Sequence, residues 1–203
     1  MTDYAADADS LLDALGWDRC FVMGVSFGGM VAQEFALRYP QRVERLALAC
    51  TSSGGAGGSS HLPREVFDLS PREMGLRVLP LFDTRLDATW QAANPEQFQQ
   101  LVDQRVAARL VSADEPNREV GLRRQLEARD GHDTYNRLPN LRMPVFICGG
   151  RYDGIAPVSN LEAIHKQVPH ARFELFEGGH FFLGQDPQAF GGIEAFLRGG
   201  LDG

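Results

Sequence analysis

The sequence predicts an α/β protein in which a mostly parallel sheet carries an all-helical insertion. Short, uniformly apolar runs, typical of buried parallel strands, alternate with amphipathic helical patterns near both ends of the chain. From about residue 61 to residue 140 the chain shows helical patterns and helix-start signals but no convincing strand. We therefore expect a core built from residues 1–60 and 141–203, and a helical cap built from residues 61–140.

The first core segment predicts, in chain order, a helix over residues 4–15, a strand over residues 20–25, a helix over residues 30–38 and a strand over residues 43–50. Gly16 and Pro40 are the signals that end the two helices. The run over residues 20–25 is too short and too uniformly apolar for an exposed element, so we expect a buried parallel strand there. Residues 52–60 contain only Gly, Ala and Ser, and this composition predicts a flexible loop.

The insertion contains two helix-start signals. Ser70-Pro71-Arg72-Glu73 is a capping box with proline at the first helical position, and Asn94-Pro95-Glu96-Gln97 repeats that pattern ahead of helically spaced apolar residues. A third helix is expected over residues 116–129. Beyond the insertion, the predicted elements are a strand over residues 144–148, a helix over residues 158–168, a strand over residues 172–176 and a helix over residues 187–197.

The composition is that of one soluble globular domain, because 43% of the 203 residues are hydrophobic and 23% are charged. The net charge of −7 argues against nucleic acid or an anionic membrane as a partner. No apolar run approaches the roughly 18 residues that span a bilayer, and the N-terminus is acidic where a secretory signal is basic, so we expect a cytoplasmic protein. Cys20, Cys50 and Cys148 are odd in number and widely spaced, which predicts reduced core cysteines.

The strongest chemical signal is Gly24-Val25-Ser26-Phe27-Gly28, a Gly-x-Ser-x-Gly pattern. It lies where a predicted buried strand turns into a helix, and small residues on both sides allow the strained turn that holds a serine hydroxyl clear of its neighbours. Such a nucleophile elbow also aims the backbone N–H of Phe27 at an oxyanion that forms on the substrate. The alternative interpretation is that Gly28 and Gly29 only allow close packing of the helix on the sheet.

A serine hydroxyl needs a base to take its proton, and that base needs an acid to orient it. His180 directly follows the last predicted strand and Asp153 follows the strand before it, so both are expected at the carboxyl edge of the sheet. Asp153 taken alone is equally consistent with an ordinary turn aspartate, but the order Ser26, Asp153, His180 favours a catalytic triad. For the other histidines we expect solvated or capping roles: His61, His132, His165 and His170.

On these motifs the chain resembles the α/β-hydrolase family. The resemblance rests on Gly-x-Ser-x-Gly-Gly at residues 24–29, the helical insertion, Gly-x-x-Asp-x-x-x-Pro at residues 150–157 and Gly-Gly-His at residues 178–180, which occur in family order. Residues 24–48 and 149–157 are similar to small bacterial carboxylic-ester, enol-lactone and carbon–carbon-bond hydrolases, such as 3-oxoadipate enol-lactonases. Dehalogenases and epoxide hydrolases of this fold carry Asp at the nucleophile position, so Ser26 argues against both.

The resemblance implies an α/β-hydrolase fold that starts partway through the family's sheet. The strands would be equivalent to the family's fifth to eighth, and the family's loop that supplies a second oxyanion donor would precede Met1. Residues 20–25 would then form an unpaired apolar edge. Three alternatives stay open: Met1 is an internal or misassigned start, the chain is a genuine remnant, or another chain supplies the missing face, as a complementing N-terminal segment or within a homo-oligomer.

The leading hypothesis is a serine hydrolase that cleaves a small ester, a lactone or an activated carbon–carbon bond. Ser26 would attack, His180 would act as base and then acid, Asp153 would orient His180, and the Phe27 N–H would be an oxyanion donor. Weaker candidates for the pocket wall are the residues next to this triad: Val25, Phe27 and Phe181. The resemblance implies a small-molecule substrate and neither a metal nor an organic cofactor. One alternative is a non-catalytic hydrolase-fold protein that binds a ligand or a partner, and another is a perhydrolase with the same triad.

Overall fold

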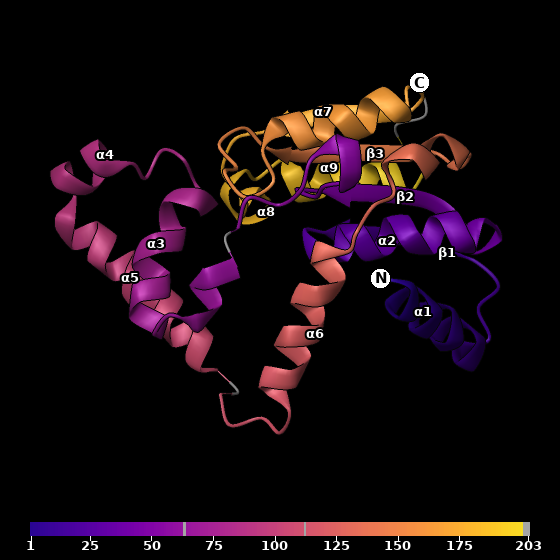
Figure 1. The fold of residues 1–203 in the computed structure, drawn as a ribbon. Coiled ribbons are helices and arrows are strands. Elements are labelled where there is room, and N and C mark those ends of the chain that lie inside the picture. Colours follow the sequence, from indigo (N-terminus) through magenta and orange to yellow (C-terminus); the bar gives the residue numbers. More distant parts are fainter. Residues whose placement is uncertain (63, 112, 201–203) are drawn as a thin grey trace.

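The protein is built around one four-stranded sheet, whose strands are all parallel and lie in the order β1-β2-β3-β4 (Figure 1). The computed structural model describes residues 1–62, 64–111 and 113–200. The strands are β1 (Cys20–Val25), β2 (Val43–Ala49), β3 (Val145–Gly150) and β4 (Arg172–Phe176). The predicted α/β class with a parallel sheet is confirmed, and each predicted strand is found with ends that differ by at most two residues. The last three residues of the predicted core lie outside the described residues.

Two hydrophobic cores lie on opposite faces of the sheet. Leu46, Leu48 and Ile147 belong to the first core, whereas Ala47 and Phe146 belong to the second. Successive side chains of a strand point to opposite faces, so β2 and β3 contribute alternate residues to the two cores. This double burial explains why β3, and β2 from Leu46 onward, are uniformly apolar in sequence rather than alternating between apolar and polar residues.

Helices cover both faces of the sheet. The first core includes residues of α1 (Thr2–Leu15), α2 (Phe27–Arg38) and α7 (Val158–Gln167), and the second includes residues of α8 (Phe182–Gln185) and α9 (Ala189–Leu197). Gly16 ends α1 with a φ of 68°, a left-handed conformation that glycine adopts without strain. Helix α2 begins at Phe27 and not at the predicted Met30, because the two glycines after Phe27 weaken the helical pattern without preventing the helix.

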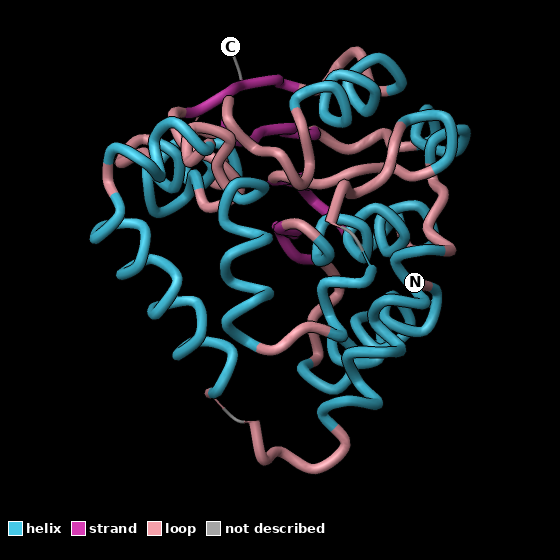
Figure 2. Tube along the Cα trace, turned by 60° about the vertical axis from the view of Figure 1, so that its left-hand side comes forward, coloured by secondary structure: helices cyan, strands magenta, loops and turns pink. Residues whose placement is uncertain are grey.

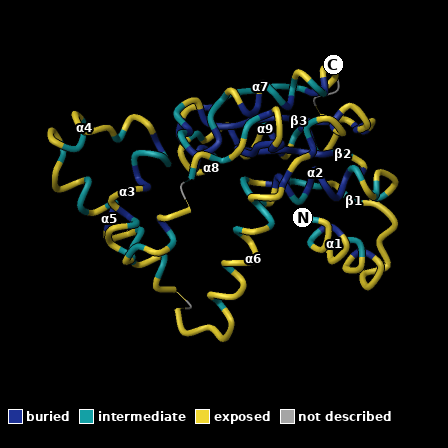
Figure 3. Tube along the Cα trace, viewed as in Figure 1, coloured by how far each residue is buried: buried dark blue, intermediate teal, exposed yellow. Residues whose placement is uncertain are grey.

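The segment between β2 and β3 has no strand among its described residues, as the sequence predicts. Its helices are α3 (Pro71–Phe82), α4 (Ala88–Ala93), α5 (Pro95–Leu110) and α6 (Arg118–Asp130), and short 3-10 turns occur at Gly55–Gly57, Arg64–Asp68 and Tyr135–Asn140. Helices α3 to α6 extend away from the sheet (Figure 2), and much of their surface is exposed (Figure 3). Within the described parts of the chain, no helix combines the length and the apolar character that crossing a membrane requires.

The two predicted helix-start signals differ in their side-chain caps. The capping box at Ser70 is confirmed, because the Ser70 Oγ accepts from the Glu73 N–H and the Glu73 carboxylate accepts from the Ser70 N–H at 3.0 Å. The helix start predicted at Asn94 is also confirmed, because α5 begins at Pro95 with Asn94 as its N-cap residue, but the Asn94 side chain makes no capping hydrogen bond. The Asn94 amide instead donates to the carbonyl of Trp90 at 2.9 Å, since the short helix α4, which the sequence pattern did not predict, ends directly at this residue.

The loop over residues 52–60 was predicted to be flexible, but its first residues are packed against the segment around residues 132–134. Ser52, Ser53 and Gly54 are buried, and the Ser53 carbonyl accepts from the Thr134 N–H at 2.8 Å. A Cβ at Gly54 would lie 1.8 Å from the carbonyl oxygen of His132. Glycine therefore allows two chain segments to meet here, and the small side chains reflect close packing rather than mobility.

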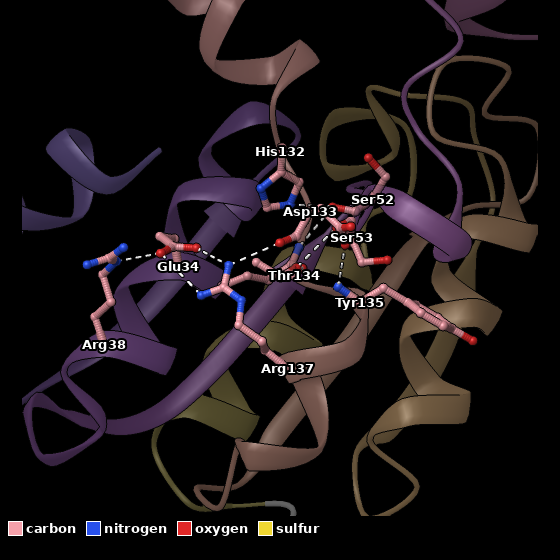
Figure 4. A network of polar contacts seen from close by, with 10 residues as sticks. Glu34, Arg38, Ser52, Ser53, His132, Asp133, Thr134, Tyr135 and Arg137 are labelled. Carbon is pink, nitrogen blue, oxygen red and sulfur yellow. Dashed lines mark hydrogen bonds and ion pairs between the residues drawn. The ribbon is translucent and has the colours of Figure 1, made fainter.

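A polar network ties the end of the helical segment to the sheet (Figure 4). The His132 ring is buried and its Nε2 lies 3.2 Å from the Ser52 carbonyl oxygen, so the predicted solvated or capping role is wrong for this histidine. Arg137 and Arg38 both bind the buried carboxylate of Glu34, with 2.6 Å between Arg137 Nη2 and Glu34 Oε2. Burial alone would raise the pKa of Glu34, but hydrogen bonds from Arg137 and Arg38 outweigh it and lower that pKa.

Candidate active site

Ser26 lies at the sharp turn between β1 and α2. Its φ of 53° falls in a region that residues other than glycine rarely adopt. The Ser26 N–H donates to the Ala49 carbonyl at 2.9 Å, and the Ser26 carbonyl accepts from Thr51 Oγ1 at 2.8 Å and from the Gly29 N–H at 2.9 Å. Bonds from the end of β2 and from the first turn of α2 therefore hold the strained backbone in place.

Two of the glycines around Ser26 are required by the packing of this turn. A Cβ at Gly24 would lie 2.5 Å from the Gly28 carbonyl oxygen, and a Cβ at Gly29 would lie 2.6 Å from the side chain of Thr51. No atom lies within 4 Å of a Cβ built at Gly28. The interpretation of close helix packing therefore applies to Gly29, whereas the second glycine of the Gly-x-Ser-x-Gly pattern has open space beside it.

Ser26, His180 and Asp153 form one continuous chain of hydrogen bonds. The His180 Nε2 lies 2.8 Å from Ser26 Oγ, and the His180 Nδ1 lies 2.8 Å from Asp153 Oδ2. His180 and Asp153 are both buried. With the proton on Nδ1 donated to the carboxylate, Nε2 is left to accept the hydroxyl proton of Ser26, which is the arrangement that proton transfer away from a serine requires.

The carboxylate of Asp153 is held by its own loop. Its Oδ1 accepts from the backbone N–H groups of Ile155 at 2.8 Å and Ala156 at 2.9 Å, and its Oδ2 faces His180. The side chain is fully buried. Because one oxygen is fixed by two backbone donors, the other oxygen has a fixed direction toward the imidazole.

The C-terminal end of α3 is hydrogen-bonded to the loop that carries Asp153. The Gly154 N–H donates to the Leu81 carbonyl at 2.9 Å, and the Thr84 N–H donates to the Tyr152 carbonyl at 2.9 Å. These two bonds flank Asp153 on both sides. The helical segment therefore supports this loop through its backbone, independently of side-chain identity.

The same end of α3 is hydrogen-bonded to the loop that carries His180. The His180 N–H donates to the Phe82 carbonyl at 2.6 Å. Asp83 Oδ2 accepts from Gln185 Nε2 at 3.1 Å, and Gln185 Oε1 in turn accepts from the Gly179 N–H at 2.8 Å. The last two residues of α3 and the two residues that follow it thus hold the loops of both His180 and Asp153.

Ser26 and His180 open into a cavity of about 490 Å³. Val25, Phe27 and Phe181, which were the predicted wall residues, all line it. The sequence did not single out the wall residues that come from the helical segment and from other loops: Leu62, Phe67, Phe82, Gln125, Leu126, Arg129, Ile155 and Leu183. No linear pattern marks them, because their common property is that the fold brings them to one opening.

Cys50, Asp153 and His180 place three potential metal-ligand atoms within 4.8 Å of one another. Metal binding at cysteine requires the thiolate. Burial, followed by the neighbouring Asp153 carboxylate, raises the pKa of Cys50 to about 12, so its thiol is neutral. The carboxylate and the imidazole are also bound to each other. The donor set therefore suits a proton-transfer chain better than a metal centre. Cys50 and Cys148 are buried and free as predicted, whereas Cys20 is partly exposed on β1.

A family model described as alpha/beta hydrolase fold matches residues 1–187. The chain belongs to this family. A poly(3-hydroxyalkanoate) depolymerase of Ectopseudomonas oleovorans is 29% identical over 174 residues, which cover 85% of this chain and 58% of that protein. The chain thus spans less than two thirds of the length of that curated relative.

Solved structures show the same architecture. A hydrolase from Pseudomonas aeruginosa PA01 has 28% sequence identity and a TM-score of 0.67, with 96% of this chain and 70% of that chain covered. The enol-lactonase from Burkholderia xenovorans LB400 has 22% identity and a TM-score of 0.67, with 98% of this chain and 70% of that chain covered. At this identity the likeness to the enol-lactonase describes the fold alone.

Proposed function

We propose that this protein is a serine hydrolase in which Ser26, His180 and Asp153 form the catalytic triad. The observation that carries the proposal is the pair of 2.8 Å contacts that His180 makes with Ser26 Oγ and Asp153 Oδ2. Nucleophile, base and orienting acid are all within hydrogen-bonding distance in the order that acyl transfer needs. The family relationship supports hydrolysis as the general reaction.

In the proposed reaction, Ser26 Oγ attacks the carbonyl carbon of the substrate while its proton moves to His180 Nε2. The carbonyl oxygen becomes an oxyanion, and the backbone N–H of Phe27 donates to it. Phe27 is the first residue of α2, so its N–H has no acceptor in a preceding helical turn and points out of the helix start. His180 then returns the proton to the leaving group, and water activated by the same imidazole hydrolyses the acyl-serine.

The substrate we propose is a small ester or lactone, or a molecule with an activated carbon–carbon bond, and its apolar part would lie in the cavity. Phe27, Phe82, Leu126 and Phe181 present hydrophobic surface there, while Ser26 and His180 supply reactive groups at one point of the wall. Leu126 and Phe82 come from the helical segment, which in this proposal acts as the cap of the site. A cytoplasmic location stays a prediction.

A fluorophosphonate probe and a short-chain p-nitrophenyl ester test this proposal. We expect covalent labelling of Ser26, and a loss of ester hydrolysis of at least about a thousandfold in Ser26→Ala. Ser60→Ala is the matched control, because Ser60 lines the same cavity without a bond to His180. Ser26→Ala that hydrolyses the ester as fast as the unsubstituted protein would overturn the assignment. Absence of both labelling and hydrolysis would favour the non-catalytic, ligand-binding alternative.

A further inference from the structure

Arg105 of α5 contacts two aromatic rings that line the Ser26 cavity. Its guanidinium carbon lies 4.0 Å from the ring centroid of Phe82 and 4.7 Å from that of Phe181. Within residues 1–62, 64–111 and 113–200, Arg105 forms no ion pair. Burial lowers the pKa of Arg105, as expected for a cation that loses water without gaining a carboxylate partner. The electron-rich faces of the two rings therefore stabilise this charge.

The two rings that Arg105 contacts lie beside His180. Phe82 and Phe181 stack on each other, with 4.7 Å between their centroids and 10° between their planes. The Phe82 ring meets the His180 ring in an edge-on arrangement, with 5.6 Å between the two centroids. The stacked pair is therefore a part of the cavity wall that packs against the imidazole used in the proposed reaction.

Burial alone does not fix the Phe181 ring. Phe181 is 48% exposed, so its ring can change rotamer with little loss of buried area. Phe82 is better anchored, because it ends α3 and its backbone carbonyl accepts from the His180 N–H at 2.6 Å. Arg105 contacts both rings from α5, which packs against α3. A planar guanidinium over the two rings therefore adds a restraint from another segment of the chain.

We infer that Arg105 is a positioning residue of the proposed active site, an inference that rests on the proposed hydrolase function. Its guanidinium holds the Phe82–Phe181 pair in place, and this pair keeps the shape of the wall that takes the apolar part of the substrate. Arg105 is not among the described residues that line the cavity, so it acts through the rings and not by touching the substrate. The rings contact the substrate equally before and during the reaction. Loss of the restraint should therefore weaken substrate binding more than it slows the chemical step.

Steady-state hydrolysis of p-nitrophenyl butyrate by three variants tests this inference. Arg105→Met keeps most of the length and apolar surface of the side chain without its charge, whereas Arg105→Lys keeps the charge. Arg109→Met is the matched control, because Arg109 lies one helical turn further along α5 and contacts no ring among the described residues. We expect KM to rise about fivefold in Arg105→Met while kcat stays within about twofold, and we expect Arg105→Lys to recover most of the loss. Arg109→Met should leave both constants unchanged.

Nuclear magnetic resonance of isotope-labelled phenylalanine separates this inference from the proposed function, because it needs no activity. The ring resonances of Phe181, assigned by their loss in Phe181→Leu, should move toward those of free phenylalanine in Arg105→Met and stay in place in Arg109→Met. Unchanged Phe181 resonances in Arg105→Met would overturn the inference, and so would an unchanged KM or a fall in kcat as large as the rise in KM. If the unsubstituted protein hydrolyses no ester, the proposed function fails, and the Phe181 resonances alone then decide whether Arg105 holds the rings.

Discussion

Replacement of His132 by glutamine should make the protein markedly less sensitive to mild acid. The His132 ring is buried in the network that joins the end of the helical segment to Ser52, and burial lowers the pKa of His132 to about 4 from an ordinary value of 6.5. In the unfolded chain the imidazole is exposed and takes up its proton near pH 6.5. Between these two pKa values, protonation therefore favours the unfolded state.

The size of this effect follows from the two pKa values. The folded state binds fewer protons than the unfolded state, so the contribution is fully present above pH 6.5 and is lost as the pH falls toward about 4. At pH 5, the unfolded state is favoured about 30-fold relative to pH 7.5, which corresponds to about 2 kcal/mol in the free energy of unfolding. His132→Gln keeps an N–H donor for the Ser52 carbonyl but has no titrating group, so this part of the acid sensitivity should disappear.

Urea unfolding followed by circular dichroism at pH 7.5 and pH 5.0 measures this difference. We expect the loss of stability on acidification to be about 2 kcal/mol smaller in His132→Gln than in the unsubstituted protein. His61→Gln is the control, because His61 is exposed and its replacement should leave the loss unchanged. The reasoning fails if His132→Gln loses as much stability as the unsubstituted protein over the same pH interval. Other carboxylates titrate in both proteins and cancel in the comparison.

Three further predictions concern packing and positioning. Gly29→Ala should cost about 1 to 3 kcal/mol in urea unfolding because its Cβ would lie 2.6 Å from a neighbouring side chain, whereas Gly28→Ala should be tolerated, and equal costs would contradict the packing argument. Asp83→Ala removes the acceptor for Gln185 in the loop of His180, so fluorophosphonate labelling should slow about tenfold, and an unchanged labelling rate would exclude a positioning role. Phe146→Ala removes a fully buried ring that packs against Phe196 of α9, so it should lower the free energy of unfolding by about 3 to 5 kcal/mol. A decrease below about 1 kcal/mol would contradict a rigid cavity at this position.

The secondary structure and the candidate reactive residues could be predicted from the sequence because they depend on local patterns. Buried parallel strands are apolar on both faces, and this appears as apolar runs over the whole of β3 and over β2 from Leu46 onward. The turn at Ser26 needs small residues within a few positions of the serine, so its signal is contained in one short motif. The sequence-based predictions were wrong where the residue type at a position is required by a contact with a distant part of the chain. At Gly54 the small residue meets the carbonyl of His132, and the pattern alone suggested mobility.

Only the tertiary structure decided which residues surround Ser26 and how they are held. His180 follows β4 and Ser26 follows β1, and their 2.8 Å contact exists because the folded sheet and its loops bring the two residues together. The support from Leu81 and Phe82, and the cavity wall from the helical segment, depend on how that segment folds back over the sheet. Such contacts join residues far apart in the chain. The entropic cost of closing the long loops between them, and the favourable contact energy, both arise only when the whole fold forms. A single sequence therefore identifies the candidate reactive groups, whereas the wall of the cavity beside them depends on the three-dimensional arrangement.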